Sequence, residues 1–101
     1  MMTRQQYLLI KLAEEASEVA KEALKCAQFG QDEVMPGQPL TNYQRLEGEI
    51  VDFYGVRQML MDETGLLGLA LDEVEYRERI TAKVAKVNHY FGVCQQLGTV
   101  S

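Results

Sequence analysis

Two short acidic runs, Glu14-Glu15-Ala16-Ser17-Glu18 and Glu49-Ile50-Val51-Asp52, decide how this sequence is expected to fold. Each run contains carboxylates three residues apart, within a segment rich in strong helix formers. Residues with this spacing lie on the same side of an α-helix, so each run presents a pair of acids on one helical face. Two antiparallel helices that carry these runs would bring four carboxylates together.

The positions of these acids on their helices distinguish them from ordinary surface charge. At about 100° per residue, Glu15 falls at the edge of the apolar arc of its helix, and Glu18 lies further round. Glu49 falls inside the apolar arc of the second helix, and Asp52 flanks that arc. An ionised carboxylate at a core position is costly unless a cation compensates it. The pattern favours a shared divalent cation such as Mg²⁺ or Mn²⁺, and salt bridges to Lys or Arg are the simpler alternative.

The apolar spacing predicts a first helix over residues 3–29, with no internal Gly or Pro. The lysines of this helix, Lys25 among them, are expected on its outer face. Gly30 is typical of a helix C-terminal stop. Residues 31–40 contain Pro36-Gly37 and Pro39 and are expected to form a loop, either as a plain connection or as a flap near a ligand.

Two further helices follow this loop. Thr41 begins a T-x-x-Q pattern that is typical of a capping box, and it predicts a second helix over residues 42–62. Residues 64–71 are expected to form a buried connection or a short helical turn. Asp72 is expected to open a third helix that ends at Gly92. The tail after Gly92 could add a fourth, short helix.

Length and composition restrict the class of protein. A chain of 101 residues that is 47% hydrophobic is expected to form one domain, residues 1–101, and the absence of strand-like alternation predicts an all-α bundle of three to four helices. The net charge of −5 argues against nucleic acid or membrane as the main partner. We expect a cytoplasmic protein, because we find no signal-peptide pattern, no transmembrane run and no disulfide framework.

Four of the ten basic residues lie on the third predicted helix, outside its apolar stripe. They are Arg77, Arg79, Lys83 and Lys86. Lys and Arg both bind phosphate, so this group could meet a triphosphate that bridges to metal ions. The alternative is a solvated face that pairs with nearby glutamates. Lys83 and Lys86 are the stronger candidates for a binding role, because they precede the polar residue Asn88 at the helix end.

The run of residues 12–19, followed by residues 46–52, resembles the MazG-like members of the all-α NTP pyrophosphatase superfamily. That superfamily carries E-E-x-x-E and then E-x-x-D on the next helix, and the resemblance spans residues 5–91. It implies an oligomeric, Mg²⁺-dependent enzyme, a homodimer or homotetramer, that acts on nucleoside triphosphates. Mn²⁺ is a further candidate for the metal.

The resemblance also implies roles for individual residues. The implied metal ligands are Glu15, Glu18, Glu49 and Asp52. The implied catalytic acids are the same four together with Glu14. The implied substrate contacts are Lys83, Lys86 and Asn88. The family often carries Asn four residues after its first Lys; here that position is Val87, and Asn88 is the nearest Asn.

The implied reaction is metal-assisted attack of water at the α–β phosphate linkage, which gives a nucleoside monophosphate and pyrophosphate. An acidic side chain of the cluster would orient the water or take its proton. The same fold with phosphoribosyl-ATP as substrate is one alternative. A non-enzymatic acidic helical interaction module is another, and it requires no divalent metal.

Overall fold

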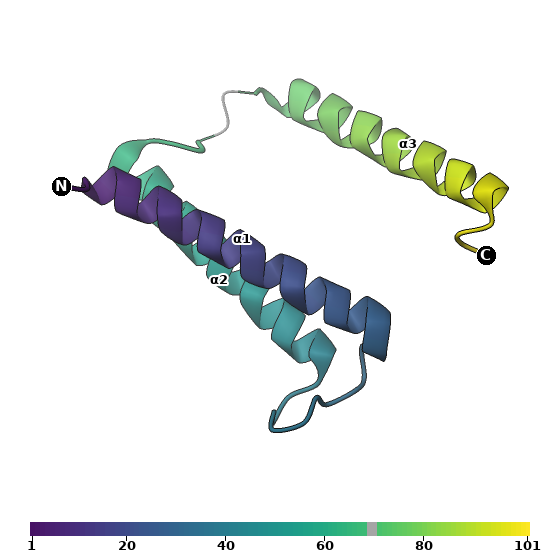
Figure 1. The fold of residues 1–101 in the computed structure, drawn as a ribbon. Coiled ribbons are helices and arrows are strands. Elements are labelled where there is room, and N and C mark those ends of the chain that lie inside the picture. The colour runs from purple at the N-terminus through teal and green to yellow at the C-terminus, as the bar shows by residue number, and fades with distance from the viewer. Residues whose placement is uncertain (69–70) are drawn as a thin grey trace. The chain divides into compact units, whose positions relative to one another are not determined.

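The computed structural model describes residues 1–68 and 71–101, which form three α-helices and no strand (Figure 1). These helices are α1 (Arg4–Phe29), α2 (Asn42–Thr64) and α3 (Glu73–Leu97). The prediction of an all-helical chain is therefore confirmed for the described residues, with three helices. None of these helices is long and apolar enough to cross a membrane. The chain divides after Gly68 into two compact units, which we describe separately.

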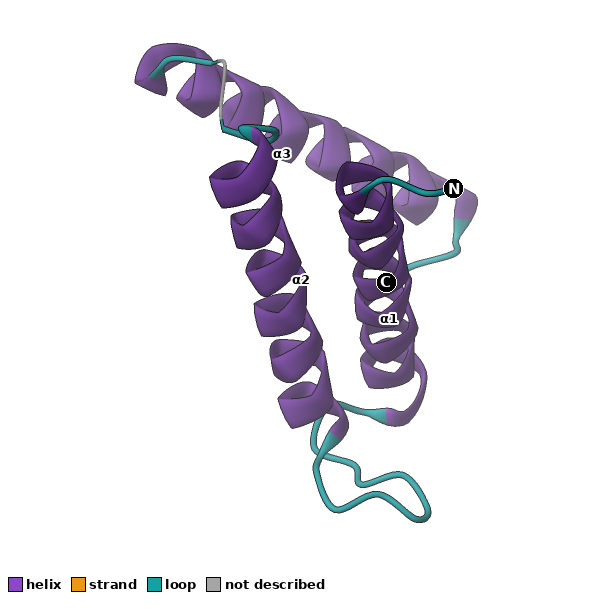
Figure 2. Ribbon diagram, turned by 90° about the vertical axis from the view of Figure 1, so that its left-hand side faces the viewer, coloured by secondary structure: helices purple, strands orange, loops and turns teal. Residues whose placement is uncertain are grey.

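The first unit is an antiparallel hairpin in which α1 and α2 pack side by side (Figures 1 and 2). Among the described residues, the fully buried apolar side chains are Leu8 of α1 and Leu60 of α2. Both lie toward the end of the hairpin that is remote from the connecting loop. Apolar side chains such as Leu12 and Phe53 are half-buried along the rest of the hairpin, and the half-buried acids Glu15 and Glu49 lie among them and mark the candidate site.

Both helices of the hairpin begin with the same capping box. The Thr3 hydroxyl accepts a hydrogen bond from the Gln6 backbone N–H (3.0 Å), and the Gln6 side chain accepts one from the Thr3 N–H (2.9 Å). Thr41 and Gln44 repeat this arrangement at 3.1 and 2.9 Å. The N-cap predicted at Thr41 is confirmed. Each box satisfies backbone donors that have no partner within the helix.

Glycines with positive φ end the two helices. Gly30 has φ 100° and ends α1 where the sequence predicts. Gly65 has φ 72°, and α2 continues past its predicted end at residue 62 as far as Thr64. Part of the predicted connection over residues 64–71 falls on residues 69–70, which lie outside the described residues.

The loop between α1 and α2 is attached to the start of α2. The backbone N–H groups of Asn42 and Tyr43 donate to the carbonyls of Glu33 (2.8 Å) and Gln31 (2.9 Å). Further along the loop, Gly37 has φ 80° within a turn closed by the Gln38 N–H and the Met35 carbonyl (3.0 Å). Glycine adopts this backbone conformation without steric strain.

The second unit consists mainly of α3. Asp72 caps its start, as predicted, by accepting a hydrogen bond from the Glu75 N–H at 2.8 Å. The predicted end at Gly92 is wrong, because the helix continues to Leu97 and ends at Gly98, where φ is 75°. A glycine inside a helix costs only about 1 kcal/mol relative to alanine, so Gly92 alone does not stop it.

The predicted apolar stripe of α3 is exposed. Each of its residues exposes between 44% and 55% of its surface: Tyr76, Ile80, Val84, Val87 and Phe91. None of the residues of α3 is buried. Among its described residues, the second unit by itself provides no packing partner for this stripe.

Candidate metal centre

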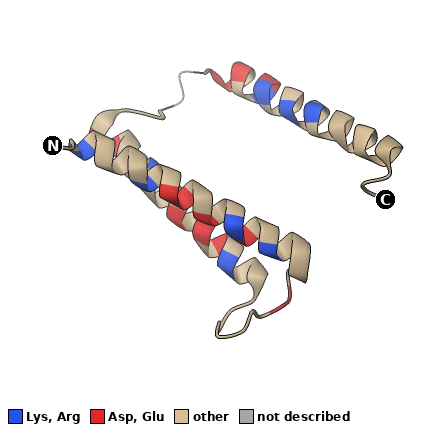
Figure 3. Cartoon of the chain, in the orientation of Figure 1, with Lys and Arg blue, Asp and Glu red and all other residues tan. Residues whose placement is uncertain are grey.

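Three acids from the two helices of the hairpin meet near its middle. Glu15 of α1 and Glu49 and Asp52 of α2 each place a carboxylate oxygen within 4.8 Å of the others. Glu15 and Glu49 are half-buried, whereas Asp52 is exposed. Figure 3 shows the acidic residues of α1 and α2 gathered in this region. We call these three residues the acid cluster.

The spacing of residues along α1 and α2 explains why these acids face each other. Leu8, Glu15 and Glu22 are seven residues apart on α1, a spacing that returns a side chain to nearly the same helical face. On α2, Arg45 and Glu49 are four residues apart and also share a face. Leu8 is buried, so the same face of α1 turns Glu15 toward α2.

The surroundings of Glu49 disfavour its charged form. Burial is the main cause that raises the pKa of Glu49, followed by a hydrogen bond with Glu15 and the negative charges of Glu15, Asp52 and Glu18. Among the described residues, no ion pair joins a Lys or Arg to any acid of the cluster. The cluster is therefore a concentrated negative site that a cation would stabilise.

The other two acids predicted for the site lie outside this group. Glu18 is half-buried and close enough for its charge to raise the pKa of Glu49, but it does not belong to the group of three. Glu14 is exposed and forms an ion pair with Lys11 at 3.0 Å. The structure thus brings together three of the four predicted ligands.

The residues predicted to contact substrate lie on α3, in the second unit. Lys83 and Lys86 line a shallow depression on the helix surface together with Arg79 and Ala82. Asn88 follows Lys86 by two residues, which is about 200° around the helix, so these two side chains do not share a face. The role of the α3 residues toward the acid cluster stays a prediction.

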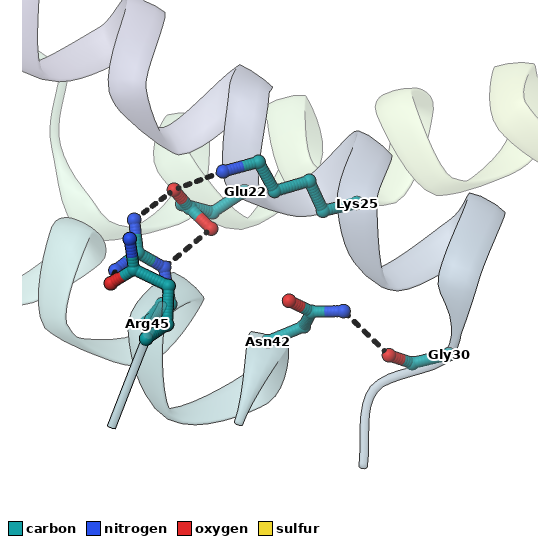
Figure 4. A network of polar contacts seen from close by, with 6 residues as sticks. Glu22, Lys25, Gly30, Asn42 and Arg45 are labelled. Carbon is teal, nitrogen blue, oxygen red and sulfur yellow. Dashed lines mark hydrogen bonds and ion pairs between the residues drawn. The ribbon is translucent and has the colours of Figure 1, made fainter. Parts of the chain in front are cut away.

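An ion pair that the sequence patterns did not predict joins Glu22, two turns after Glu15 on α1, to Arg45, one turn before Glu49 on α2 (Figure 4). The carboxylate of Glu22 is fully buried and accepts hydrogen bonds from Nη2 (3.0 Å) and Nε (3.3 Å) of Arg45. Nη1 of Arg45 donates to the side-chain oxygen of Gln38 in the loop. The hydrogen bond from Arg45 is the main cause that holds the pKa of Glu22 below its ordinary value, and Lys25 contributes in the same direction.

The sequence contained a signal for this pair. Glu22 continues the spacing of Leu8 and Glu15, and Arg45 precedes Glu49 by one turn. The prediction that Lys25 lies on the outer face of its helix is wrong: its ammonium group lies 3.4 Å from the Glu22 carboxylate. Residues three apart are neighbours on a helix, so a buried Glu22 draws the long side chain of Lys25 inward.

Asn42 closes the loop end of the hairpin (Figure 4). It is fully buried, and its side-chain amide donates a hydrogen bond to the carbonyl of Gly30 at 2.9 Å. This contact satisfies a carbonyl immediately after the last turn of α1. The side-chain oxygen of Asn42 has no hydrogen-bond partner within the described part of the chain.

No protein-family model, curated protein or solved structure matches the chain. Three carboxylates from two helices form a set of hard oxygen ligands, which suits Mg²⁺ or Mn²⁺ and leaves positions for water or phosphate oxygens. Oxygens around an octahedral Mg²⁺ lie about 3 Å apart when they are neighbours and about 4.2 Å apart when they are opposite, so these ligand atoms, within 4.8 Å of each other, would move closer together to bind one ion.

Proposed function

We propose that the protein is a Mg²⁺-dependent nucleoside triphosphate pyrophosphohydrolase, with its metal held by the acid cluster. The observation that carries the proposal is the meeting of Glu15, Glu49 and Asp52 without a protein cation paired to them. The resemblance of the two acidic runs to the MazG-like pattern supports the same reaction. Mn²⁺ is expected to substitute for Mg²⁺, because both prefer oxygen ligands.

In this reaction the bound cation and the residues around it would have separate roles. When bound, Mg²⁺ supplies positive charge that polarises phosphate oxygens and lowers the pKa of a water molecule. Glu18 lies close enough for its charge to act on Glu49 and forms no ion pair among the described residues, so we assign it the role of orienting the water or accepting its proton. Lys83 and Lys86 would offset phosphate charge. The products would be a nucleoside monophosphate and pyrophosphate.

A non-enzymatic interaction module is the second candidate function. The half-exposed apolar stripe of α3 supports it, because a stripe of this kind is typical of a helix that packs against another surface. The same observation is also compatible with the homodimer or homotetramer expected of the enzyme. Divalent metal separates the two candidates, since the interaction module requires none.

The proposal is tested by incubating the full-length protein with Mg²⁺ and a panel of canonical and modified nucleoside triphosphates, together with phosphoribosyl-ATP. Chromatography should identify a monophosphate and pyrophosphate in equal amounts. Glu49→Gln should lower kcat/KM by at least about 100-fold, because it replaces a charged metal ligand by a neutral side chain of similar size. Glu63→Gln is the matched control, since Glu63 is an exposed acid of the same helix that is paired with Arg4. The proposal would be rejected if the protein hydrolysed none of the compounds in the panel.

A further inference from the structure

We infer that Glu22 is a positioning residue for the metal centre: it holds the guanidinium of Arg45 and so prevents Arg45 from occupying the acids that would bind the cation. The inference rests on the proposed function, because it assumes a cation at the acid cluster. It concerns Glu22 and Arg45, which are not themselves members of that cluster. Their contribution would be to keep the site free of a competing protein cation.

The contacts of Arg45 show how it is held. Nη2 and Nε of Arg45 donate to the two carboxylate oxygens of Glu22, and Nη1 donates to Gln38. All three guanidinium nitrogens are therefore engaged with partners outside the acid cluster. Among the described residues, no ion pair joins Arg45 to Glu49 or Glu18. A paired fork of this kind fixes orientation as well as distance.

Arg45 would reach the acids if it were released. It precedes Glu49 by one helical turn, a spacing at which oppositely charged side chains form ion pairs. The hydrogen bond to Glu22 is the main cause that raises the pKa of Arg45, and the charges of Glu49 and Glu18 act in the same direction, so both acids lie within electrostatic range. A guanidinium on the Glu49 carboxylate would compete with Mg²⁺ or Mn²⁺ for the same oxygens.

Burial makes Glu22 suitable for this role. Its side chain has no exposed surface, whereas the side chain of Arg45 exposes 24%. Lys25 gives Glu22 a second cation, which favours the ionised form that a bidentate contact requires. The Arg4–Glu63 pair has a similar bidentate geometry, at 2.9 and 3.2 Å, but both of its side chains are exposed. It therefore provides a matched comparison.

The test measures the affinity of the full-length protein for Mn²⁺ by isothermal titration calorimetry, without nucleotide. Glu22→Gln should weaken Mn²⁺ binding about tenfold, because Arg45 is released toward Glu49 and Glu18. The double variant Glu22→Gln with Arg45→Gln should bind Mn²⁺ within about threefold of the wild-type affinity, because the competing cation is absent. Glu63→Gln should leave the affinity unchanged. A purely structural role for Glu22 would lower the free energy of unfolding in Glu22→Gln without weakening Mn²⁺ binding by the folded protein.

Two results would overturn the inference. One is an unchanged Mn²⁺ affinity in Glu22→Gln, and the other is a double variant that binds as weakly as the single one. If Glu22→Gln does not fold, Glu22→Asp replaces it: the side chain keeps its charge but is one methylene shorter, so its oxygens are drawn back from the guanidinium, and an unchanged affinity again overturns the inference. A wild-type chain without Mn²⁺ affinity would reject the proposed metal site as well. Metal binding without nucleotide hydrolysis would reject only the proposed enzymatic function.

Discussion

Glu22 and Glu49 both occupy inward positions of the same hairpin, but the surroundings of Glu22 stabilise its charged form and those of Glu49 disfavour it. Glu22 accepts hydrogen bonds from Arg45 and Lys25, and its pKa is lowered. Glu49 is partly buried beside other acids, and its pKa is raised. The first arrangement stabilises the fold, whereas the second opposes it in the absence of a cation. An acid retained in an unfavourable position is a candidate for function rather than for structure.

The largest expected effect comes from removing Glu22. Glu22→Ala should lower the free energy of unfolding by about 3 kcal/mol, because it leaves Arg45 partly buried without its carboxylate partner. Urea denaturation of the full-length protein measures this change. A loss below about 1 kcal/mol would indicate that the pair is effectively solvated, and the contrast with Glu49 would then disappear.

Removing Glu49 should have the opposite sign in the absence of metal. Glu49→Gln eliminates a charge that its neighbours destabilise, so the melting temperature in EDTA should rise. The wild-type protein should gain about 2.7 kcal/mol at a Mg²⁺ concentration 100 times the dissociation constant, and Glu49→Gln should gain far less. Equal responses to Mg²⁺ in the two proteins would contradict a site at the acid cluster.

The two acids should also give opposite dependences of stability on pH. The folded pKa of Glu49 lies above its ordinary value of 4.5, so the folded state holds a proton that the unfolded state has lost. Stability in EDTA should therefore fall as the pH rises from about 4.5 through that folded pKa. The folded pKa of Glu22 is lowered, so its contribution is present above 4.5 and is lost as the pH falls through the folded pKa.

Thermal melts between pH 3 and 8 would separate these contributions. We expect Glu49→Gln to lack the decline above about pH 4.5, and the double variant of Glu22 and Arg45 to lack the corresponding loss at lower pH. Saturating Mg²⁺ should reverse the decline assigned to Glu49, because the cation binds the ionised carboxylate. The same profile in wild type and Glu49→Gln would refute the assignment to Glu49.

The smallest effect is expected at the exposed ion pair of Arg4 and Glu63. Both side chains are accessible to water, at 56% and 38% of their surface, so solvent replaces most of what the pair contributes. Glu63→Gln should shift the melting temperature by little more than the reproducibility of the measurement. A loss comparable with that of Glu22→Ala would show that burial does not account for the difference between the two bidentate pairs.

The sequence predicts those parts of the fold that local chemistry determines. Capping residues at Thr41 and Asp72 and the glycine at position 30 mark helix ends through hydrogen bonds and backbone freedom that involve only nearby residues. Gly92 misled the prediction because a glycine ends a helix only when it leaves the helical conformation. Its neighbours continue the helix, and Gly98 supplies the end instead.

The candidate site could be predicted in part. The apolar arcs place Glu15 and Glu49 at inward positions, and the structure brings them together with Asp52. Glu22 and Arg45 are 23 residues apart in the sequence and lie on different helices. Their contact therefore depends on the register in which α1 packs against α2. Helical periodicity identifies which face a residue lies on, but it does not determine the opposing residue on another helix.

The repeated capping box has a consequence for how the hairpin could be rebuilt. Thr3 with Gln6 and Thr41 with Gln44 each start a helix without help from the other, and residues 31 and 33 are already tied to the beginning of α2. Between Val34 and Gly37, the backbone hydrogen bond that the structure shows is local and joins the Met35 carbonyl to the Gln38 N–H. We therefore expect the chain to tolerate an inserted segment there, or even a break that yields two fragments able to reassociate, while the acids keep their places.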